Sequence, residues 1–332
     1  MRAASTEDRR YCRIVLPQVS RTFAISIRLL SGPMGEAVRI GYLLCRSADA
    51  LEDSWRGDAG EIRARFAELV RAIDGDESAA QGLARRAAGV AQGRADLELV
   101  ARLPSVLAVH GALPAPDREA IVECVRTMGA GMSHFAARAA ARPPDGAYLD
   151  TEAELDEYCF AVAGCVGVML TRMFAARAIL GRPEAAARLL ALAPRVGEAL
   201  QLTNIVLDWP VDVRRGRCFV PASWLAEHGL RPRDLVGRDH PGVRALAARL
   251  ESRARSALAC VPGYLALVPL AAVRYRLFCL WPAVWAAGSL THARRDPEFP
   301  WGARRPRLPR AVLWRRAIAS LFLPPEAALR RA

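Results

Sequence analysis

The sequence predicts an all-α protein, folded as a single-domain helical bundle. Apolar segments of roughly ten to thirty residues with helical periodicity follow one another between breaks rich in Gly and Pro. No convincing run of alternating β-branched residues indicates a strand, and no repeat of solenoid length is apparent. Hydrophobic residues make up 52% of the 332 residues, which favours packed helices over disorder. We expect residues 1–303 to form the domain and residues 304–332 a basic, amphipathic tail.

The charge balance narrows the possible partners. The formal net charge is +13, and every basic residue is an arginine. This balance favours phosphate-bearing partners or an anionic membrane surface. Nucleic acid gains little support, because the arginines are dispersed and no zinc-finger or RNA-binding motif occurs. The eight cysteines form no C-x-x-C pair and the N-terminus has no apolar signal region, so we expect a cytoplasmic protein without disulfides.

The first acidic motif is Asp49, Glu52 and Asp53, three carboxylates within an otherwise apolar helical segment. Helical spacing places them on one face, together with Arg46 and Tyr42. Carboxylates this close repel each other unless a cation lies between them. Mg2+ holding a phosphate is one candidate, since it prefers one or two carboxylates plus phosphate oxygens. The alternative is a solvated acidic end of a helix.

The second acidic motif is a polar stripe at helical spacing, formed by Gln201, Asn204, Asp208 and Asp212. Apolar residues surround the stripe, so its polar groups require partners. The arginine-rich sequence 214–217 follows at once and supplies cations for a phosphate. Pro210 is expected to kink or end the helix between the two aspartates, because it removes one helix hydrogen bond.

Small residues mark two further segments. The sequence Met128-Gly-Ala-Gly-Met132 interrupts a helical pattern, and close contact with another helix is the simplest explanation. In residues 155–174, small residues recur near helical spacing at Ala161, Gly164 and Gly167. They allow close helix packing or leave room for a long apolar ligand. Tyr158 stands at the polar start of that segment, where a structural hydroxyl is the common role.

The C-terminal third is apolar and then basic. Residues 256–273 reach the minimum length of a membrane span, but Pro262 and Pro269 interrupt them, and we interpret them as buried core. Residues 304–323 are basic and amphipathic and too short to span a bilayer. They suit either an interfacial helix on a membrane or a terminal helix docked on the domain.

Five motifs, in this order, resemble those of the squalene/phytoene synthase family from Ser20 to about Pro282. They are S-R-[ST]-F-A over Ser20–Ala24, Y-x-x-x-R-x-x-D-x-x-E-D over Tyr42–Asp53, M-G-x-G-M over Met128–Met132, Y-C-x-x-V-A-G-x-V-G over Tyr158–Gly167, and Q-x-T-N-I-x-x-D-x-x-x-D over Gln201–Asp212. Gly216, Arg217 and Pro221 continue the last motif. Each motif alone is weak, but five in order are specific.

The resemblance implies an isoprenoid synthase fold with a central apolar channel. It also implies head-to-head condensation of two farnesyl diphosphates to presqualene diphosphate. Mg2+ would be bound by Asp49, Glu52, Asp53, Asp208 and Asp212. The catalytic residues implied are Tyr158, Asp49, Asp53, Asp208 and Asp212. The diphosphate substrate would be bound by Ser20, Arg21, Phe23, Tyr42, Arg46, Gln201, Asn204 and Arg217.

One sequence block, at residues 278–282, indicates which product the resemblance implies. Phe278-Cys-x-x-Pro282 resembles a block of squalene synthases, which reduce their intermediate to squalene with NADPH. The resemblance implies NADPH contacts at Arg21, Arg46, Phe278, Cys279, Pro282, Arg305 and Arg307.

Two positions depart from the family pattern. Leu207 stands where the family usually has Arg, and Val211 where it usually has Glu. Enzymes of the family without reduction, which make presqualene diphosphate, dehydrosqualene or phytoene, therefore remain alternatives. An alternative from another class is a non-catalytic protein that binds prenyl lipids. We expect a monomer, with peripheral contact to the inner face of the membrane through the tail.

Overall fold

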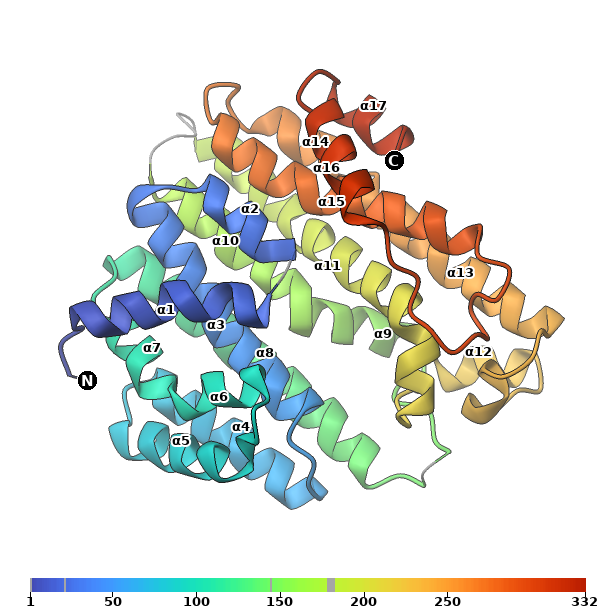
Figure 1. Cartoon of the computed structure of the whole chain (residues 1–332), viewed down its shortest axis with the longest axis horizontal. Coiled ribbons are helices and arrows are strands. Elements are labelled where there is room, and N and C mark those ends of the chain that lie inside the picture. The colour runs from blue at the N-terminus through green and yellow to red at the C-terminus, as the bar shows by residue number, and fades with distance from the viewer. Residues whose placement is uncertain (1, 21, 144, 178–182) are drawn as a thin grey trace. The chain divides into compact units, whose positions relative to one another are not determined.

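The computed structural model describes residues 2–20, 22–143, 145–177 and 183–332, and these residues contain helices and no strand (Figure 1). The predicted all-α fold is confirmed. All eight cysteines lie in the described part of the chain and are free thiols, as expected.

The helices gather into two compact units, each made of two stretches of chain. The first unit comprises Met1–Ala141 and Val168–Ala186, and the second comprises Arg142–Gly167 and Ala187–Ala332. The chain passes between the units within α10, Cys165–Ala175, and within α11, Pro183–Arg214.

The first unit is built around α3, whose residues Leu43, Leu44 and Ala48 are completely buried. The helices of this unit are α1 Thr6–Val19, α2 Thr22–Leu29, α3 Gly32–Asp53, α4 Ala59–Ile73, α5 Glu77–Ala91, α6 Ala95–Ala101, α7 Leu103–Gly111 and α8 Ala115–Ala140. Helix α3 packs against α6, α7 and α8. Its position in the core fixes the direction of every side chain in the first acidic motif.

Local sequence determines where several of these helices begin. Asp58 accepts a hydrogen bond from the Glu61 N–H at 2.8 Å, and Glu61 accepts one from the Asp58 N–H at 3.0 Å. This reciprocal capping box starts α4. The α4 and α8 helices then pack closely, because a Cβ at Gly129 would lie 3.2 Å from the Val70 side chain. The predicted helix contact at the glycines of residues 128–132 is thereby confirmed for Gly129.

The second unit contains most of α11 and the C-terminal helices. Its other helical elements are α9 Glu152–Cys159, the π-helix η1 Phe160–Gly164, α12 Ala222–Glu227, the 3-10 helix η2 Pro232–Leu235, α13 Pro241–Leu258, α14 Val261–Leu267, α15 Val273–Arg294, α16 Arg310–Ala319 and α17 Pro325–Arg330. A Cβ at Gly167 would collide with the Ala193 carbonyl, and one at Gly197 with the Ala163 carbonyl. Of the two expectations for the small residues, close helix packing is therefore confirmed.

Residues 256–273, which we expected to be buried core, are only partly buried. They comprise the end of α13, all of α14 and the turn that leads into α15; Val261, Tyr264 and Leu265 are buried, whereas Leu270 and Val273 are exposed. By length and composition, one stretch of the described chain, Glu152–Ala175, could cross a membrane, with a mean hydropathy of 1.6. Because 56% of it is buried within the protein, it also has the character of a core helix.

Candidate active site

The first acidic motif occupies the accessible edge of α3. In the last turns of this helix Tyr42, Arg46, Asp49 and Glu52 are partly exposed and Asp53 is exposed, whereas Leu43, Leu44, Cys45, Ser47, Ala48, Ala50 and Leu51 are buried. The spacing of the accessible residues follows one helical face, as predicted.

Asp49 lies in an environment that disfavours its charge. Burial raises the pKa of Asp49 to about 6, Arg46 opposes the shift, and the nearby Asp53 adds to it. The Asp49 side chain is still 34% exposed, so solvent moderates the effect. Arg46 Nη1 lies 3.4 Å from Asp49 Oδ2. A cation placed beside this edge would relieve the repulsion between the two carboxylates.

Asp96 joins this group, although the sequence pattern did not single it out. It stands in the first turn of α6, and its Oδ2 lies 3.6 Å from Arg46 Nη2. The Ser54 hydroxyl donates a hydrogen bond to the same carboxylate, and the Leu97 N–H donates one at 3.0 Å. Arg46 is therefore held between two carboxylates, Asp49 and Asp96, from separate helices.

Ser20 and Phe23 lie next to the same edge of α3. The rings of Phe23 and Tyr42 are 5.7 Å apart. Burial raises the pKa of Tyr42 to about 12, against the opposing effect of its hydrogen bond with Ser20. The structure thus brings Ser20, Phe23, Tyr42 and Arg46 together, while Arg21 lies outside the described residues.

The second acidic motif lies on α11, and the helix runs through it. The expectation that Pro210 ends the helix is wrong, since α11 continues to Arg214. A proline removes only one N–H from the helix ladder. In addition, Arg214 Nη1 donates to the Pro210 carbonyl at 2.6 Å. Asp208 and Asp212 are therefore one turn apart on the same helix.

The stripe around these aspartates is the accessible side of α11. Gln201, Asp208 and Asp212 are partly exposed and Asn204 is exposed, while Leu202, Thr203, Ile205, Val206, Leu207 and Trp209 are buried. The predicted polar face is confirmed. Leu207, which stands where the family usually has Arg, is 4% exposed and belongs to the core. At that position this chain has a buried apolar side chain where the family usually has a charged one.

A tight turn places Arg217 directly after the second motif. Gly216 has φ = 80°, which glycine adopts at little cost. The Gly216 N–H donates to the Val213 carbonyl at 3.0 Å, and the Arg217 N–H donates to the Asp212 carbonyl at 2.8 Å. These two bonds form a Schellman motif. The Gly-Arg pair of the sequence therefore ends α11 and fixes the Arg217 backbone at the end of the helix that carries Asp212.

A segment from the C-terminal part of the chain reaches the same motif. Arg305 Nη1 lies 2.8 Å from Asp208 Oδ1. Arg214 donates to the Trp301 carbonyl at 3.0 Å and also to the Gly302 carbonyl. Residues 301–305 are therefore tied to α11 at two points. The family resemblance implied NADPH as the partner of Arg305 and gave no indication of this contact.

Tyr158 belongs to a buried aromatic cluster. Its ring stacks on Phe219 with centroids 5.0 Å apart, and Tyr148 lies 4.8 Å from Phe219 and 5.8 Å from Tyr158. All three side chains are at most 8% exposed. The π-helix η1 begins two residues after Tyr158, and such segments often occur at functional sites. The described ring contacts of Tyr158 are with other buried aromatic side chains.

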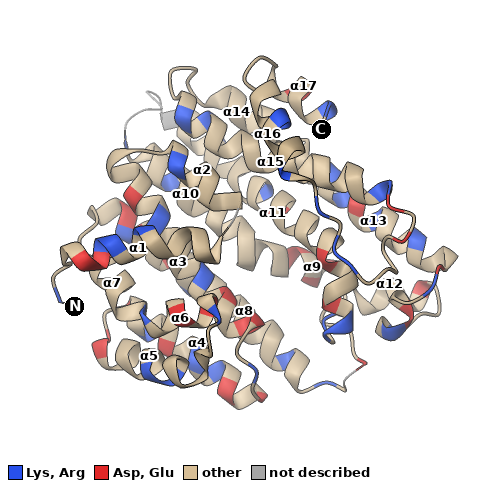
Figure 2. Ribbon diagram, in the orientation of Figure 1, with Lys and Arg blue, Asp and Glu red and all other residues tan. Residues whose placement is uncertain are grey.

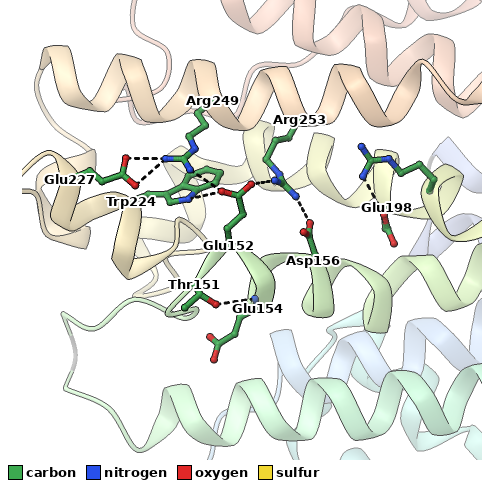
Figure 3. Close-up of polar contacts among 10 residues, drawn as sticks. Thr151, Glu152, Glu154, Asp156, Glu198, Trp224, Glu227, Arg249 and Arg253 are labelled. Atoms are coloured by element: carbon green, nitrogen blue, oxygen red, sulfur yellow. Dashed lines mark hydrogen bonds and ion pairs between the residues drawn. The ribbon is translucent and has the colours of Figure 1, made fainter.

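An ion-pair network anchors the helix that carries Tyr158 (Figure 3). Glu152 of α9 accepts hydrogen bonds from Arg249, at 2.8 Å, and from Arg253, both on α13. Arg253 also donates to Asp156, one turn further along α9. The Arg249 guanidinium lies 3.8 Å above the Trp224 ring. These contacts hold α9 against α12 and α13 and thereby fix the direction of Tyr158.

Glu198 is a second carboxyl group that the motif pattern missed. It lies on α11 beside η1, and a Cβ at Gly164 would come within 3.3 Å of its Oε1. Burial raises the pKa of Glu198, while Arg195, 3.8 Å away, opposes the shift.

The block Phe278, Cys279 and Pro282 lies on α15. Phe278 and Pro282 are buried, and burial raises the pKa of the Cys279 thiol to about 12. Tyr275 hydrogen-bonds to Cys279, and the hydroxyls of Tyr275 and Tyr264 are 2.7 Å apart. The described contacts of this block stay near α14 and α15, whereas Arg305 contacts α11. Whether these groups bind one cofactor stays a prediction.

The carboxylates fit a metal that shares its ligands with phosphate. Within the described residues, no three His, Cys, Asp or Glu side chains form a ready-made metal site. Mg2+ commonly takes only one or two protein carboxylates and completes its octahedron with phosphate oxygens and water. Asp49 with Asp53, and Asp208 with Asp212, each supply such a pair on an accessible helix face. Burial raises the pKa of Asp49, and a cation bound beside this carboxyl group would favour its charged form.

Comparison with known proteins places these features in a family. The Squalene/phytoene synthase family model matches residues 16–312. A Phytoene synthase of Thermus thermophilus is 43% identical over 137 residues, which cover 39% of this chain and 44% of that protein. The Squalene synthase of Schizosaccharomyces pombe is 27% identical over 289 residues, which cover 87% of this chain and 60% of that protein.

A solved structure supports the same placement. The complex of TcSQS with a ligand matches with a TM-score of 0.75 at 25% identity, over 98% of this chain and 90% of that chain. The chain spans about half the length of the first curated relatives that it matches, between 44% and 60%. The family model covers most of the chain, so this protein belongs to the squalene/phytoene synthase family.

Proposed function

We propose that this protein catalyses the head-to-head condensation of two prenyl diphosphates. One observation carries the proposal. Each of two buried helices, α3 and α11, presents a pair of carboxylates on its accessible face, with an arginine beside it. Paired carboxylates and guanidinium groups are what a metal-bound diphosphate requires.

The proposed roles follow from the side chains. Asp49, Glu52 and Asp53 on α3, and Asp208 and Asp212 on α11, would hold Mg2+. When bound, Mg2+ offsets the charge of the diphosphate and makes it a better leaving group. Arg46 and Arg217 would bind diphosphate oxygens in bidentate geometry.

The proposed chemistry forms a carbon–carbon bond. The C–O bond of one prenyl diphosphate breaks and its electron pair leaves with the diphosphate, which gives an allylic cation. The double bond of the second prenyl chain attacks this cation, and loss of a proton closes a cyclopropane ring. Tyr158 is our candidate for the group beside this step, because its aromatic surroundings exclude water that would trap the cation.

The finer proposal is a squalene synthase that acts on farnesyl diphosphate. Support comes from the Phe278-Cys-x-x-Pro282 block and from the similarity to a squalene synthase over 87% of this chain. NADPH would supply the hydride that reduces the cyclopropyl intermediate. Arg307 is exposed and Arg305 is 35% exposed, so both guanidinium groups are accessible to a cofactor phosphate.

A second candidate is a phytoene or dehydrosqualene synthase, which omits the reduction. The 43% identity to a phytoene synthase over 137 residues favours it. So does the buried Leu207, since it removes an arginine that the family usually carries beside the second motif.

Product analysis separates these candidates. The purified protein is incubated with Mg2+ and either farnesyl or geranylgeranyl diphosphate, with and without NADPH. Squalene that forms only with NADPH supports the squalene synthase. Dehydrosqualene, phytoene or presqualene diphosphate formed regardless of NADPH supports the second candidate.

A pair of variants tests the condensation itself. We expect Asp53→Asn to reduce diphosphate release by at least about a hundredfold, because it weakens metal-assisted departure of the leaving group. Glu119→Gln, an exposed carboxyl on α8 outside both motifs, is the matched control and should retain full activity. A wild-type protein that binds prenyl chains but never releases diphosphate would overturn the proposal and indicate a lipid-binding protein.

A further inference from the structure

Helix α16 is attached to the second unit through its inner face. The Trp285 indole N–H donates to the Leu313 carbonyl at 3.0 Å, and Ala317 is completely buried. The Arg316 guanidinium lies against Gly288, where a Cβ would collide with it, and donates to the Ala332 carbonyl. Helix α16 is therefore docked on the second unit, which was one of the two alternatives for residues 304–323.

The outer face of α16 and of the turn that follows is apolar and exposed. Trp314 is 46% exposed, Ile318 55%, Leu321 49% and Phe322 81%. Trp314 and Ile318 are four residues apart on one side of α16, and Leu321 and Phe322 lie in the turn that follows it. We call these four residues the C-terminal apolar face. Soluble proteins rarely leave several large apolar side chains adjacent and uncovered, so such a face indicates a contact surface.

Arginines surround this face. Residues 304–332 contain eight arginines, and Glu326 is their one acidic residue. Arg310 and Arg315 are exposed on α16 itself, and Arg330 and Arg331 are exposed at the end of α17. Figure 2 shows arginine positions along the segment that leads into α16 and on α17. An exposed apolar stripe edged by arginine is the pattern of a helix that lies in the surface of an anionic membrane.

The connection between α14 and α15 also exposes apolar side chains next to an arginine. The connection between α14 and α15 exposes Leu270 to 79% and Val273 to 54%, and Arg274 beside them is exposed. This connection and the turn between α16 and α17 both lie at the top of the view in Figure 1. Helix α17 packs against both α14 and α15, so these elements belong to one layer of the second unit.

We propose that the C-terminal apolar face docks on the anionic surface of a lipid bilayer. Ile318 and Phe322 enter the boundary between headgroups and acyl chains, and the half-exposed Trp314 lies at headgroup level, where amphipathic rings are favoured. Arg310 and Arg315 pair with lipid phosphates.

Charge favours a bilayer over a second copy of this chain. A symmetric dimer through this face would bring two sets of arginines together, with Glu326 as the one carboxylate of each tail to offset them. An anionic bilayer supplies the missing negative charge and the apolar medium at once. Binding of this kind does not depend on the proposed reaction, although a hydrocarbon product would need an apolar phase to enter.

The test is flotation of the purified full-length chain with lipid vesicles and without substrate. Vesicles of phosphatidylcholine with phosphatidylglycerol should bind the wild type, and vesicles of phosphatidylcholine alone should bind it much less. The double variant Ile318→Ser/Phe322→Ser keeps the net charge and should lower the partition coefficient about tenfold or more. The matched control Ile14→Ser removes an apolar residue that is 49% exposed on α1 and should leave binding unchanged.

A second variant pair tests the charge. Arg310→Gln/Arg315→Gln should lower the partition into anionic vesicles about fivefold or more per arginine at low salt. Arg85→Gln/Arg231→Gln, two exposed arginines outside this surface, removes equal charge and should have a much smaller effect. Unchanged thermal midpoints will show that all variants fold, as expected for exposed side chains.

Three outcomes overturn the proposal. Equal binding of the double serine variant and the wild type would mean that the general positive charge, not this face, binds the vesicles. Equal binding to neutral and anionic vesicles would exclude the role of the arginines. A concentration-dependent dimer that the serine variant abolishes, without vesicle binding, would assign the face to a second copy. Because the assay contains no prenyl diphosphate, it is independent of the catalytic proposal.

Discussion

Arg305 and Asp208 form an ion pair of 2.8 Å, so a cation of the protein itself contacts a carboxylate that we propose as a metal ligand. In the proposed metal site the Arg305 guanidinium would compete with Mg2+ for the Asp208 carboxylate. We expect Arg305→Gln to tighten Mg2+ binding to the substrate-free protein about two- to fivefold, the usual size for a partly exposed pair. Titration calorimetry measures this.

Arg304→Gln is the matched control, since Arg304 is an exposed neighbour in the same segment. Its Mg2+ affinity should equal that of the wild type. Equal affinities for all three proteins would show that Arg305 does not compete for Asp208. If NADPH also binds Arg305, the Arg305→Gln enzyme will show a raised KM for NADPH as well.

The glycines between η1, α10 and α11 should be intolerant of any side chain. Gly197→Ala places a Cβ on the Ala163 carbonyl, and the backbones of two helices must separate to admit it. We expect a loss of about 3 kcal/mol in the free energy of unfolding. Gly89→Ala on α5 is the control, since a Cβ there meets nothing within 4 Å, and it should stabilise the protein by about 0.5–1 kcal/mol. Urea denaturation of both variants checks the prediction, which fails if they shift stability equally.

A buried ion pair supports the first unit. Arg177 holds Asp117 through two bonds of 2.8 Å, and the Asp117 side chain is 2% exposed. Asp117→Asn removes the charge and leaves Arg177 uncompensated, so we expect a loss of about 3 kcal/mol. The comparison is Glu123→Gln, because Glu123 pairs with Arg172 at the surface and is 58% exposed. That change should stay within about 0.5 kcal/mol. A small effect at Asp117 would show that the pair is weakly coupled.

The start of α1 should be sensitive to acid. Asp8 accepts hydrogen bonds from Arg2 and from the Ser5 N–H of the capping box, and these hold its pKa far below the ordinary value. A depressed carboxyl pKa adds stability above the ordinary value near 4, and this contribution is lost as the pH falls through and below that value. Asp8→Asn should therefore cost about 1–2 kcal/mol at neutral pH and progressively less below about pH 4. Thermal unfolding of both proteins between neutral and acid pH measures this, and a cost independent of pH would contradict it.

Local patterns were sufficient to predict the helices and the faces of both acidic motifs. Helical spacing alone placed Asp49 beside Asp53 and Asp208 beside Asp212, because the period of a helix is fixed by its backbone. Pro210 was expected to kink or end the helix, and the expected end is wrong, because the loss of one N–H does not stop α11 before Arg214.

The partners of the charged residues could not be predicted in this way. Arg46 meets Asp96 and Asp208 meets Arg305, and about fifty and one hundred residues of chain separate the members of these pairs. No periodicity relates positions so distant, so the members of each pair meet only in the folded chain. The π-helix η1 could not be predicted from the sequence either, because its residues are equally compatible with an α-helix.

That π-helix is equivalent to one extra residue in a helical run from Glu152 to Ala175. The Cys165 N–H reaches back five residues to the Phe160 carbonyl. Deleting a single residue here would restore a regular helix and rotate everything before it by about 100° relative to everything after it. Tyr158 would then leave Phe219, and Glu152 would leave Arg253. The orientation of the tyrosine therefore depends on residue count as much as on residue identity, and an alignment gap in this segment would mark a relative with a different site.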